Sequence, residues 1–256
     1  MITVCVPYIP SVWKELPYEW DDRRFEFQQA VDIPVMQGGK EPSVCGDTVL
    51  SLSEAEEAMK LLGPRFRILA NSCFPRINRD VLRLCEMIVN YGSGITVTDL
   101  PFARHLRQLF PSIKLHSSVI MNFYEDIDTI CTSNLFDSIG GSEFYNDDTQ
   151  KMIDVIPEKY RDKVQYILLG CVWRPECIAH YEIPSLMWRY PEAFKEFKFG
   201  EGFCHGRKGH NIDIKKLIAA GFTKFKFGYR TPSAEEARYT LGNFFKDIQH
   251  TDHASL

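Results

Sequence analysis

The sequence contains no apolar run long enough to cross a membrane, and it carries no excess of basic residues. A membrane-spanning helix needs about 20 consecutive apolar residues. The longest apolar runs here, such as YILLG at 166–170, are far shorter than that. The 30 Lys and Arg residues are outnumbered by 34 Asp and Glu residues, which gives a net charge of −4. Autonomous nucleic-acid binding is therefore not expected, because phosphate contacts need clustered cations. The N-terminus has no basic stretch that would suggest an export signal, so we expect a cytoplasmic protein without membrane association.

Several catalytic and metal-binding motifs are also missing. No C-x-x-C pair occurs among the eight cysteines, which argues against a zinc ribbon or a thioredoxin-like site. No G-x-G-x-x-G follows the first predicted strand, so an open doubly wound sheet is the weaker alternative for the fold. Neither H-E-x-x-H nor G-x-S-x-G is present, and no motif supports a hydrolase. A disulfide framework is not expected, since the cytosol keeps thiols reduced.

What the sequence does contain is a regular alternation of short apolar runs and amphipathic stretches. The runs are rich in β-branched and aromatic residues, as buried parallel strands are. Eight strands alternating with helices predict a (β/α)8 TIM-type barrel, with residues 1–256 forming a single domain. The predicted strands are 2–7, 33–38, 67–72, 94–99, 113–118, 136–141, 164–170 and 223–228.

The ends of the predicted helices are marked by capping residues. Ser53 with Glu56 has the spacing of a capping box. Asn78 precedes a second amphipathic stretch, which ends at Gly92, a residue type suited to a C-cap. Further helices are predicted at 101–110, 147–156 and 233–248.

One connection, residues 171–212 between the last two strands, is unusually long and rich in Cys, Pro, Trp and His. Connections of this length are usually functional, so we predict a lid insertion there. Five cysteines fall on the predicted catalytic face of the barrel: Cys45, Cys73, Cys171, Cys177 and Cys204. Thiolates that converge there predict a metal or an iron–sulfur cluster, for which four cysteines are the usual ligand set. The other three, Cys5, Cys85 and Cys131, are predicted to be small buried apolar residues.

Zinc remains an alternative to the cluster, because histidine also ligates zinc. His180, His205 and His210 share the predicted lid with the cysteines. The fourth ligand is thus Cys204, Cys73 or one of these histidines.

Four segments, taken in order, resemble the collagenase-like peptidase family. The first segment is a predicted strand followed by Asp and a helix, and the second is a Phe-Pro stretch that contains His and Asn. The third is a Cys-rich segment after a strand, and the fourth covers the last predicted strand and the residues before it. They are GITVTDLPFARHLRQLFP (94–111), LFPSIKLHSSVIMNFY (109–124), GCVWRPECIAHY (170–181) and DIKKLIAAGFTKFKFGYR (213–230). The last departs from the family pattern, because KFGYR stands where the family has KIEGR.

The resemblance implies more than a peptidase, because several relatives are oxygen-independent hydroxylation proteins that bind a 4Fe–4S cluster. It implies cluster ligation by Cys45, Cys171, Cys177 and Cys204, and an aromatic or nucleobase-like substrate. The C-x5-C pair formed by Cys171 and Cys177 is closer than the family spacing. Members of the family also work in pairs, so a second barrel subunit, identical or different, is implied as a partner.

Other candidate site residues lie at the ends of the predicted strands. His116, Asp99 and Glu143 are the candidate catalytic groups, and Asp99 has the alternative role of a helix N-cap. Lys226 and Arg230, at and beyond the last strand, are the candidate anion site.

Three further polar residues are candidates for contacting the substrate. They are Asn71, Ser117 and Asn122. The sequence therefore leaves three hypotheses: an iron–sulfur hydroxylating or redox enzyme, a metal- or Cys-dependent hydrolase, and a non-catalytic barrel whose metal is structural.

Overall fold

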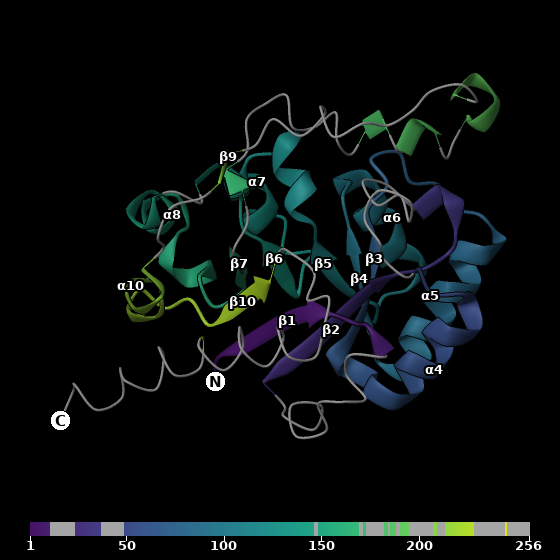
Figure 1. Ribbon diagram of the computed structural model, residues 1–256, viewed down its shortest axis with the longest axis horizontal. Coiled ribbons are helices and arrows are strands. Elements are labelled where there is room, and N and C mark those ends of the chain that lie inside the picture. The colour runs from purple at the N-terminus through teal and green to yellow at the C-terminus, as the bar shows by residue number, and fades with distance from the viewer. Residues whose placement is uncertain are drawn as a thin grey trace.

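The computed structural model describes most of the chain as one barrel (Figure 1). The described residues are 1–10, 24–36, 49–145, 148–168, 171–172, 182–183, 185–187, 190–194, 207–208, 213–227 and 244.

Eight parallel strands form a closed barrel in the order β1-β10-β7-β6-β5-β4-β3-β2. This confirms the predicted (β/α)8 architecture. The barrel strands are β1 (Thr3–Pro7), β2 (Phe25–Ala30), β3 (Phe66–Ala70), β4 (Gly94–Val97), β5 (Lys114–Ser117), β6 (Ser138–Gly140), β7 (Val164–Leu168) and β10 (Lys224–Phe227). Two short strands, β8 (Cys171–Val172) and β9 (Arg207–Lys208), pair with each other in an antiparallel sheet.

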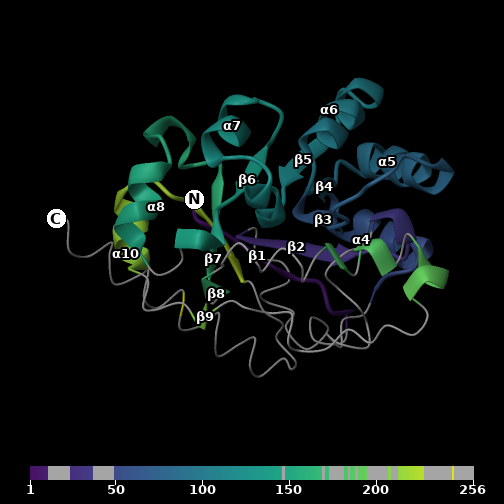
Figure 2. The ribbon, with the colours of Figure 1, turned by 90° about the horizontal axis from the view of Figure 1, so that it is seen from above.

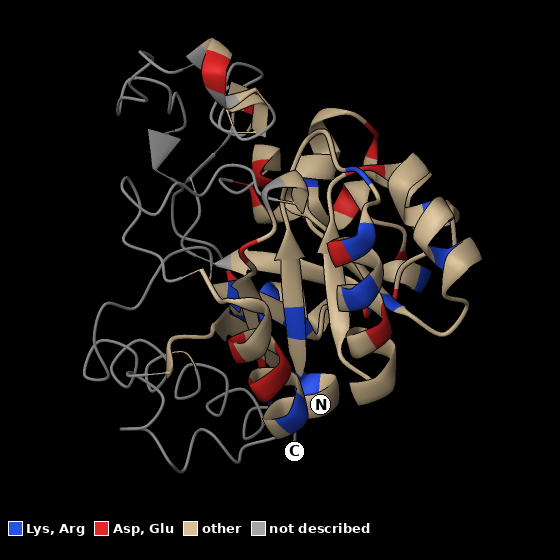
Figure 3. Ribbon diagram, turned by 90° about the vertical axis from the view of Figure 1, so that its right-hand side faces the viewer, with Lys and Arg blue, Asp and Glu red and all other residues tan. Residues whose placement is uncertain are grey.

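Helices cover the outside of the barrel. Figure 2 shows α5 and α6 on one side and α8 and α10 on the opposite side. The α-helices are α4 (Leu52–Leu62), α5 (Arg79–Tyr91), α6 (Leu100–Leu109), α7 (Ile127–Thr132), α8 (Thr149–Val155) and α10 (Ile214–Ala219). Short 3-10 turns are η1 (Pro34–Met36), η2 (Gly63–Arg65), η3 (Val119–Phe123), η4 (Glu143–Tyr145), η5 (Glu158–Tyr160) and η7 (Pro191–Phe194). Basic and acidic residues are interspersed along the helices that face the viewer in Figure 3.

One predicted strand is wrong. Residues 33–38 were expected to form the second strand, but the strand is β2, and residues 34–36 form the turn η1. β2 has the sequence FEFQQA, in which Phe25 and Phe27 alternate with Glu26 and Gln28. The prediction looked for runs that are apolar on both faces of the strand. It therefore missed β2, which has one polar face.

The helix caps agree with the sequence at α5 and differ at α4. The side chain of Asn78 accepts a hydrogen bond from the Val81 amide, and Gly92 ends α5 in the left-handed region at φ 66°. For α4 the predicted box is displaced by two residues: Ser51 is the N-cap, and it exchanges hydrogen bonds with Glu54. Both pairs have the same S-x-x-E spacing, and the earlier start adds half a turn to the helix.

Each barrel strand has an apolar outer face and an inner face that carries polar residues, so the interior of this barrel is not purely apolar. On the outer face, large buried residues such as Phe25, Phe66 and Tyr166 form the apolar core. On the inner face, polar residues occur in every strand; they are Glu26, Arg67, Thr96, His116, Ser138, Gln165 and Lys224, with Cys5 on β1. The interior of a typical barrel is filled by branched apolar side chains, so a polar interior is a specific feature of this chain.

Two other expectations concern the cysteines and the lid. Cys5, Cys85 and Cys131 are buried and free of disulfides, as predicted. Most of the predicted lid, 171–212, and the predicted helix at 233–248 lie outside the described residues, so both remain predictions, as does the single-domain organisation. Within the described part of the chain, every helix is too short or too polar to span a bilayer.

Candidate functional site at the C-terminal mouth of the barrel

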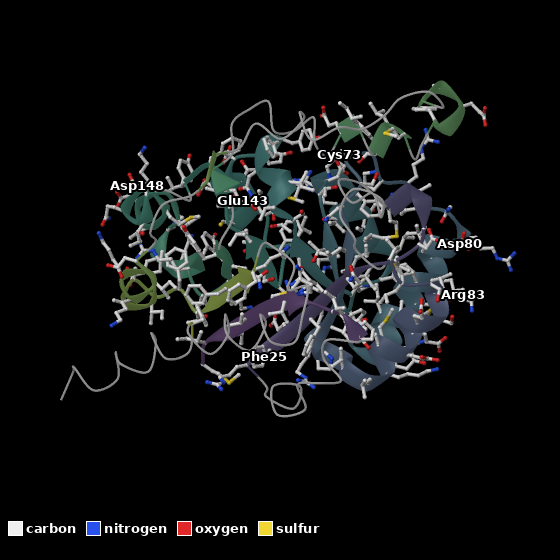
Figure 4. All side chains as sticks on the ribbon, in the orientation of Figure 1. Phe25, Cys73, Asp80, Arg83, Glu143 and Asp148 are labelled. Carbon is white, nitrogen blue, oxygen red and sulfur yellow. The ribbon has the colours of Figure 1, made fainter. Side chains whose placement is uncertain are left out.

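The C-terminal ends of the strands carry most of the predicted site residues, because loops after parallel strands meet at one end of a barrel. Asn71 and Cys73 follow β3, Asn122 lies on η3 after β5, and Glu143 begins η4 after β6. Cys171 begins β8, three residues after β7 ends. Figure 4 labels Cys73 and Glu143, both on the upper side of the barrel in that view. The structure therefore gathers these predicted residues on one face.

Asn122 ties the loop after β5 to the end of β6. Its Nδ2 donates to the carbonyl of Val119 at 3.0 Å and to that of Gly140 at 3.1 Å. Its Oδ1 is buried and has no hydrogen-bond partner among the described residues. A buried carbonyl oxygen without a partner is costly, so a donor such as an enclosed water molecule is expected beside it.

Asn71 and Ser117, the other two predicted substrate contacts, have different surroundings. Ser118 Oγ donates to Asn71 Oδ1 at 3.3 Å, which links the loop after β3 to η3 at the mouth. Ser117 is buried, and its Oγ accepts a hydrogen bond from the Gly140 amide at 3.0 Å. This bond holds the end of β5 to β6. The Ser117 side chain therefore links two strands and does not face the mouth as a substrate contact.

A cavity of about 480 Å³ opens beside this network, between the loop after β5 and the loop after β6. Its wall is polar and aromatic, and it includes Asn122, Tyr124, Ser142, Phe144 and Tyr145, with Glu125, Asp126 and Asp128 also on the lining. Phe123 and Phe144 make an edge-to-face contact, with centroids 5.1 Å apart, at this position. A cavity of this size can hold a small planar molecule.

Described pieces of the predicted lid contact the mouth. The amide of Cys73 donates to Ser185 Oγ at 3.1 Å, and the Tyr124 hydroxyl donates to Glu182 Oε1 at 2.9 Å. Burial raises the pKa of the Cys73 thiol to about 11. The thiol is therefore neutral at physiological pH and is not an activated nucleophile. Tyr124, Glu182 and Ser185 were missed at the sequence level, where no motif marks them.

Asp99 and Glu143, the two candidate catalytic carboxylates, are positioned differently. Asp99 is the N-cap of α6, and its Oδ1 accepts a hydrogen bond from the Phe102 amide at 2.6 Å. This is the alternative role that the sequence suggested for it. Glu143 is buried at the start of η4, and β8 contacts η4. Glu143 thus lies on the segment next to Cys171.

Cys171, one of the predicted ligand cysteines, lies in a small antiparallel sheet formed by β8 and β9. Cys171 pairs with Lys208 and Val172 with Arg207, so the chain leaves β8 and enters β9 at the same end of this small sheet. Cys177 is five residues beyond Val172, and Cys204 is three residues before Arg207. Both cysteines lie outside the described residues, so their ligand roles stay predictions.

Four of the predicted site residues, Cys45, Cys177, Cys204 and Arg230, lie outside the described residues, and only the backbone of Cys171 is described. Among the described side chains, no group of three His, Cys, Asp or Glu residues is arranged to hold a metal ion. Cys73, the alternative fourth ligand, is therefore not part of such a group within that set.

His116 and Lys226 lie inside the barrel on its polar face, rather than in the loops of the mouth. His116 is the third residue of β5, and its Nδ1 is 2.6 Å from Ser138 Oγ. Arg67 Nη1 donates to the same Ser138 Oγ at 3.3 Å and to Gln165 Oε1 at 3.3 Å, while Nη2 pairs with Glu26. His116 thus belongs to a buried hydrogen-bond network, which the sequence did not reveal.

We expect His116 to make folding stability depend on pH. Burial, with Arg67 and Lys224 nearby, holds the imidazole pKa well below its usual value. Below about pH 6.5 the unfolded chain takes up a proton that the folded chain does not. Stability is therefore retained above that pH and falls by about 1.4 kcal/mol per pH unit as the pH drops below it.

Urea unfolding at pH 7.5 and 5.5 measures this loss, and His116→Gln should remove most of it. If the variant and the parent lose equal stability between the two pH values, His116 is not the group responsible.

Comparison with known proteins places this fold. The chain is similar in structure to the U32 peptidase Mk0906, with a TM-score of 0.61 over 91% of this chain and 94% of that one. The sequence identity is 10%, so the similarity establishes the fold. U32 peptidases are the collagenase-like family that the four sequence segments resemble. No protein-family model and no curated protein matches the sequence.

Proposed function

We propose that this chain is an iron–sulfur barrel protein of the U32, collagenase-like type that catalyses oxygen-independent hydroxylation or a related redox modification. Two independent lines support the proposal: the ordered sequence segments resemble this family, and the barrel shares its fold with a U32 peptidase. The observation that supports the cluster assignment is the position of Cys171, which begins β8 just after barrel strand β7, in the segment that resembles the Cys-rich stretch of this family.

The donor set fits an iron–sulfur cluster, because three or four thiolates are the ligands that such a cluster takes. Cys171, Cys177 and Cys204 would hold it, with Cys45 as the proposed fourth ligand. When bound, the cluster would supply one-electron transfer. A cytoplasmic location, where thiols stay reduced, belongs to the same proposal.

The remaining residues of the mouth bind and orient the substrate in this proposal. The cavity beside Asn122 and Phe144 accepts an aromatic or nucleobase-like ring, against which Phe144 can stack. Ser142 and Tyr145 line the same wall and offer hydrogen bonds to polar groups of the ring. Glu143, next to β8, is the group that would hold or move a proton at the reacting atom.

Analysis of iron, sulfide and zinc in protein purified without oxygen tests the cluster. About four iron and four sulfide per chain are expected, with the visible absorption of a 4Fe–4S centre. Cys171→Ser and Cys177→Ser should each lose most of the iron. Cys131→Ser is the matched control, because Cys131 is buried on α7 and is not a proposed ligand.

Three results would contradict the proposal. One zinc per chain in place of iron would indicate a structural or hydrolytic metal site. Folded protein without metal or colour would remove the cluster altogether. Equal iron in the Cys131, Cys171 and Cys177 variants would show that the thiolates of β8 and the following segment are not its ligands.

A further inference from the structure

The cavity between the loop after β5 and the loop after β6 has charged residues of one sign in its wall. Three of the residues that line it are acidic, Glu125, Asp126 and Asp128, and none of the described lining residues is Lys, Arg or His. A fourth carboxylate adjoins the wall, because the hydroxyl of Tyr124, a lining residue, donates to Glu182 Oε1 at 2.9 Å. The described wall therefore carries negative charge that no cation within it balances.

The fold itself uses only one of the three lining carboxylates. Asp126 is the N-cap of α7, and it accepts hydrogen bonds from the Thr129 amide at 2.8 Å and from Thr129 Oγ1 at 3.0 Å. The side chains of Glu125 and Asp128 form no hydrogen bond or ion pair within the described part of the chain. Water satisfies an exposed carboxylate, so the significance of these two comes from the cavity that they share.

Aromatic rings make up the other part of the wall. Phe123, Tyr124, Phe144 and Tyr145 all line the cavity, and the rings of Phe123 and Phe144 meet edge to face at 72°. The face of an aromatic ring carries partial negative charge, so it attracts ammonium and guanidinium groups. Rings and unpaired carboxylates in one cavity together favour an organic cation over a neutral or anionic ligand.

A metal ion matches these carboxylates less well than an organic cation does. Among the side chains that the structure describes, no three His, Cys, Asp or Glu residues are arranged to hold a metal ion. Calcium takes about six to eight oxygen ligands in direct contact, and it therefore needs ligands that converge. An ammonium group is attracted to carboxylates that do not touch it, and a cavity of about 480 Å³ has room for the ring that carries it.

We propose that this cavity binds an aromatic or heteroaromatic ring that carries a protonated amine, with the ring against Phe144 and the ammonium group near Glu125 and Asp128. This rests on the proposed function for one point, that the cavity is the substrate site, and it adds the charge of the substrate. The same carboxylates repel a ring that carries a phosphate or carboxylate group. Binding of the amine does not require the cluster.

Ligand-observed NMR titration of the full chain at pH 7 tests the charge preference. The probes are phenethylamine, 2-phenylethanol and phenylacetate, which carry a phenyl ring with a positive, a neutral and a negative group. Phenethylamine should show saturable binding at about millimolar concentration, as expected for so small a ligand. The alcohol should bind about threefold to tenfold more weakly, and phenylacetate more weakly still. Sodium chloride at about 1 M should reduce the preference by screening the carboxylates.

The double variant Glu125→Gln, Asp128→Asn removes both charges and keeps the shape of the two side chains. It should bind the amine and the alcohol about equally, and unchanged affinity for the alcohol shows that the cavity is intact. Asp80→Asn is the matched control, because Asp80 and Asp128 are both exposed acidic residues in the first turn of a helix. Asp80 lies on α5, well apart from Glu143 in Figure 4, and its variant should keep the parent's preference.

Equal binding of phenethylamine and 2-phenylethanol by the parent would overturn this proposal. So would a double variant that keeps the parent's preference for the amine. If no probe binds, the ring site of the proposed function is lost as well. The analysis of iron and sulfide is a separate measurement: protein that lacks a cluster but prefers the amine contradicts the proposed function and leaves the cation site in place.

Discussion

Gly140→Ala should destabilise the protein by about 3 kcal/mol, the upper part of the range for overpacking a core. A Cβ at this position would lie 2.7 Å from the Val119 amide nitrogen and 2.9 Å from the Ser117 carbonyl oxygen. Both are backbone atoms, which cannot move aside as a flexible side chain can. For a domain of this size, thermal unfolding should show a midpoint lower by about 6 to 12 °C.

The same substitution should also disturb the mouth. The Gly140 amide donates to Ser117 Oγ, and its carbonyl accepts from Asn122. A shift of β6 away from η3 therefore breaks both bonds and moves Asn122 at the cavity. The expected result is weaker binding of any aromatic ligand, together with lower stability.

Gly92→Ala is the matched control, because it changes only backbone preference. Gly92 has φ 66°, but a Cβ there meets nothing within 4 Å. Its cost is about 1 kcal/mol from left-handed strain alone. If Gly140→Ala costs no more than this control in urea or thermal unfolding, β6 does not approach η3 as closely as the structure indicates.

Barrel topology could be predicted from sequence because most of the strands have a strong local signal. In β4 and β7, which read GITV and VQYIL, short and largely apolar runs are flanked by turn and cap residues, so each strand is recognisable alone. β2 is different: Glu26 and Gln28 face the interior, and the run FEFQQA resembles an amphipathic surface strand. Only the closed barrel shows that its polar face is enclosed.

The polar interior could not be predicted for the same reason. Alternation in KLHS or KFKF shows that one face is polar, yet it does not show whether that face meets solvent or seven other strands. His116 was therefore assigned to the mouth, whereas its contact with Ser138 depends on the pairing of β5 with β6. Long-range register decides this, and no local pattern encodes it.

The sequence predicted where the candidate site residues lie better than it predicted what their side chains do. Asn71, Cys73 and Glu143 lie at the mouth because any residue just after a barrel strand does so. What each side chain does depends on its partners. Asp99 follows β4 as expected, but its carboxylate caps α6. The capping hydrogen bond depends only on the local turn at the start of that helix.

Arg67→Met should destabilise the protein by about 3 kcal/mol or more, since it leaves the partner of a buried pair without compensation. Arg67 is 3% exposed, and its guanidinium bonds to side chains on three strands: Glu26 on β2, Ser138 on β6 and Gln165 on β7. Methionine fills a similar volume but satisfies none of these groups. Urea unfolding at pH 7 measures the loss.

A double-mutant cycle separates the charge pair from the rest of the network. Glu26→Gln alone leaves the Arg67 charge buried without its carboxylate, so it too should be costly. The double variant Glu26→Gln, Arg67→Met should lose less than the two single losses combined, with a coupling of about 1 to 3 kcal/mol. If the two losses in free energy of unfolding simply add, the Glu26–Arg67 ion pair contributes no coupling energy to stability. Arg67 would then stabilise the barrel through Ser138 and Gln165, by joining β3 to β6 and β7 across the interior.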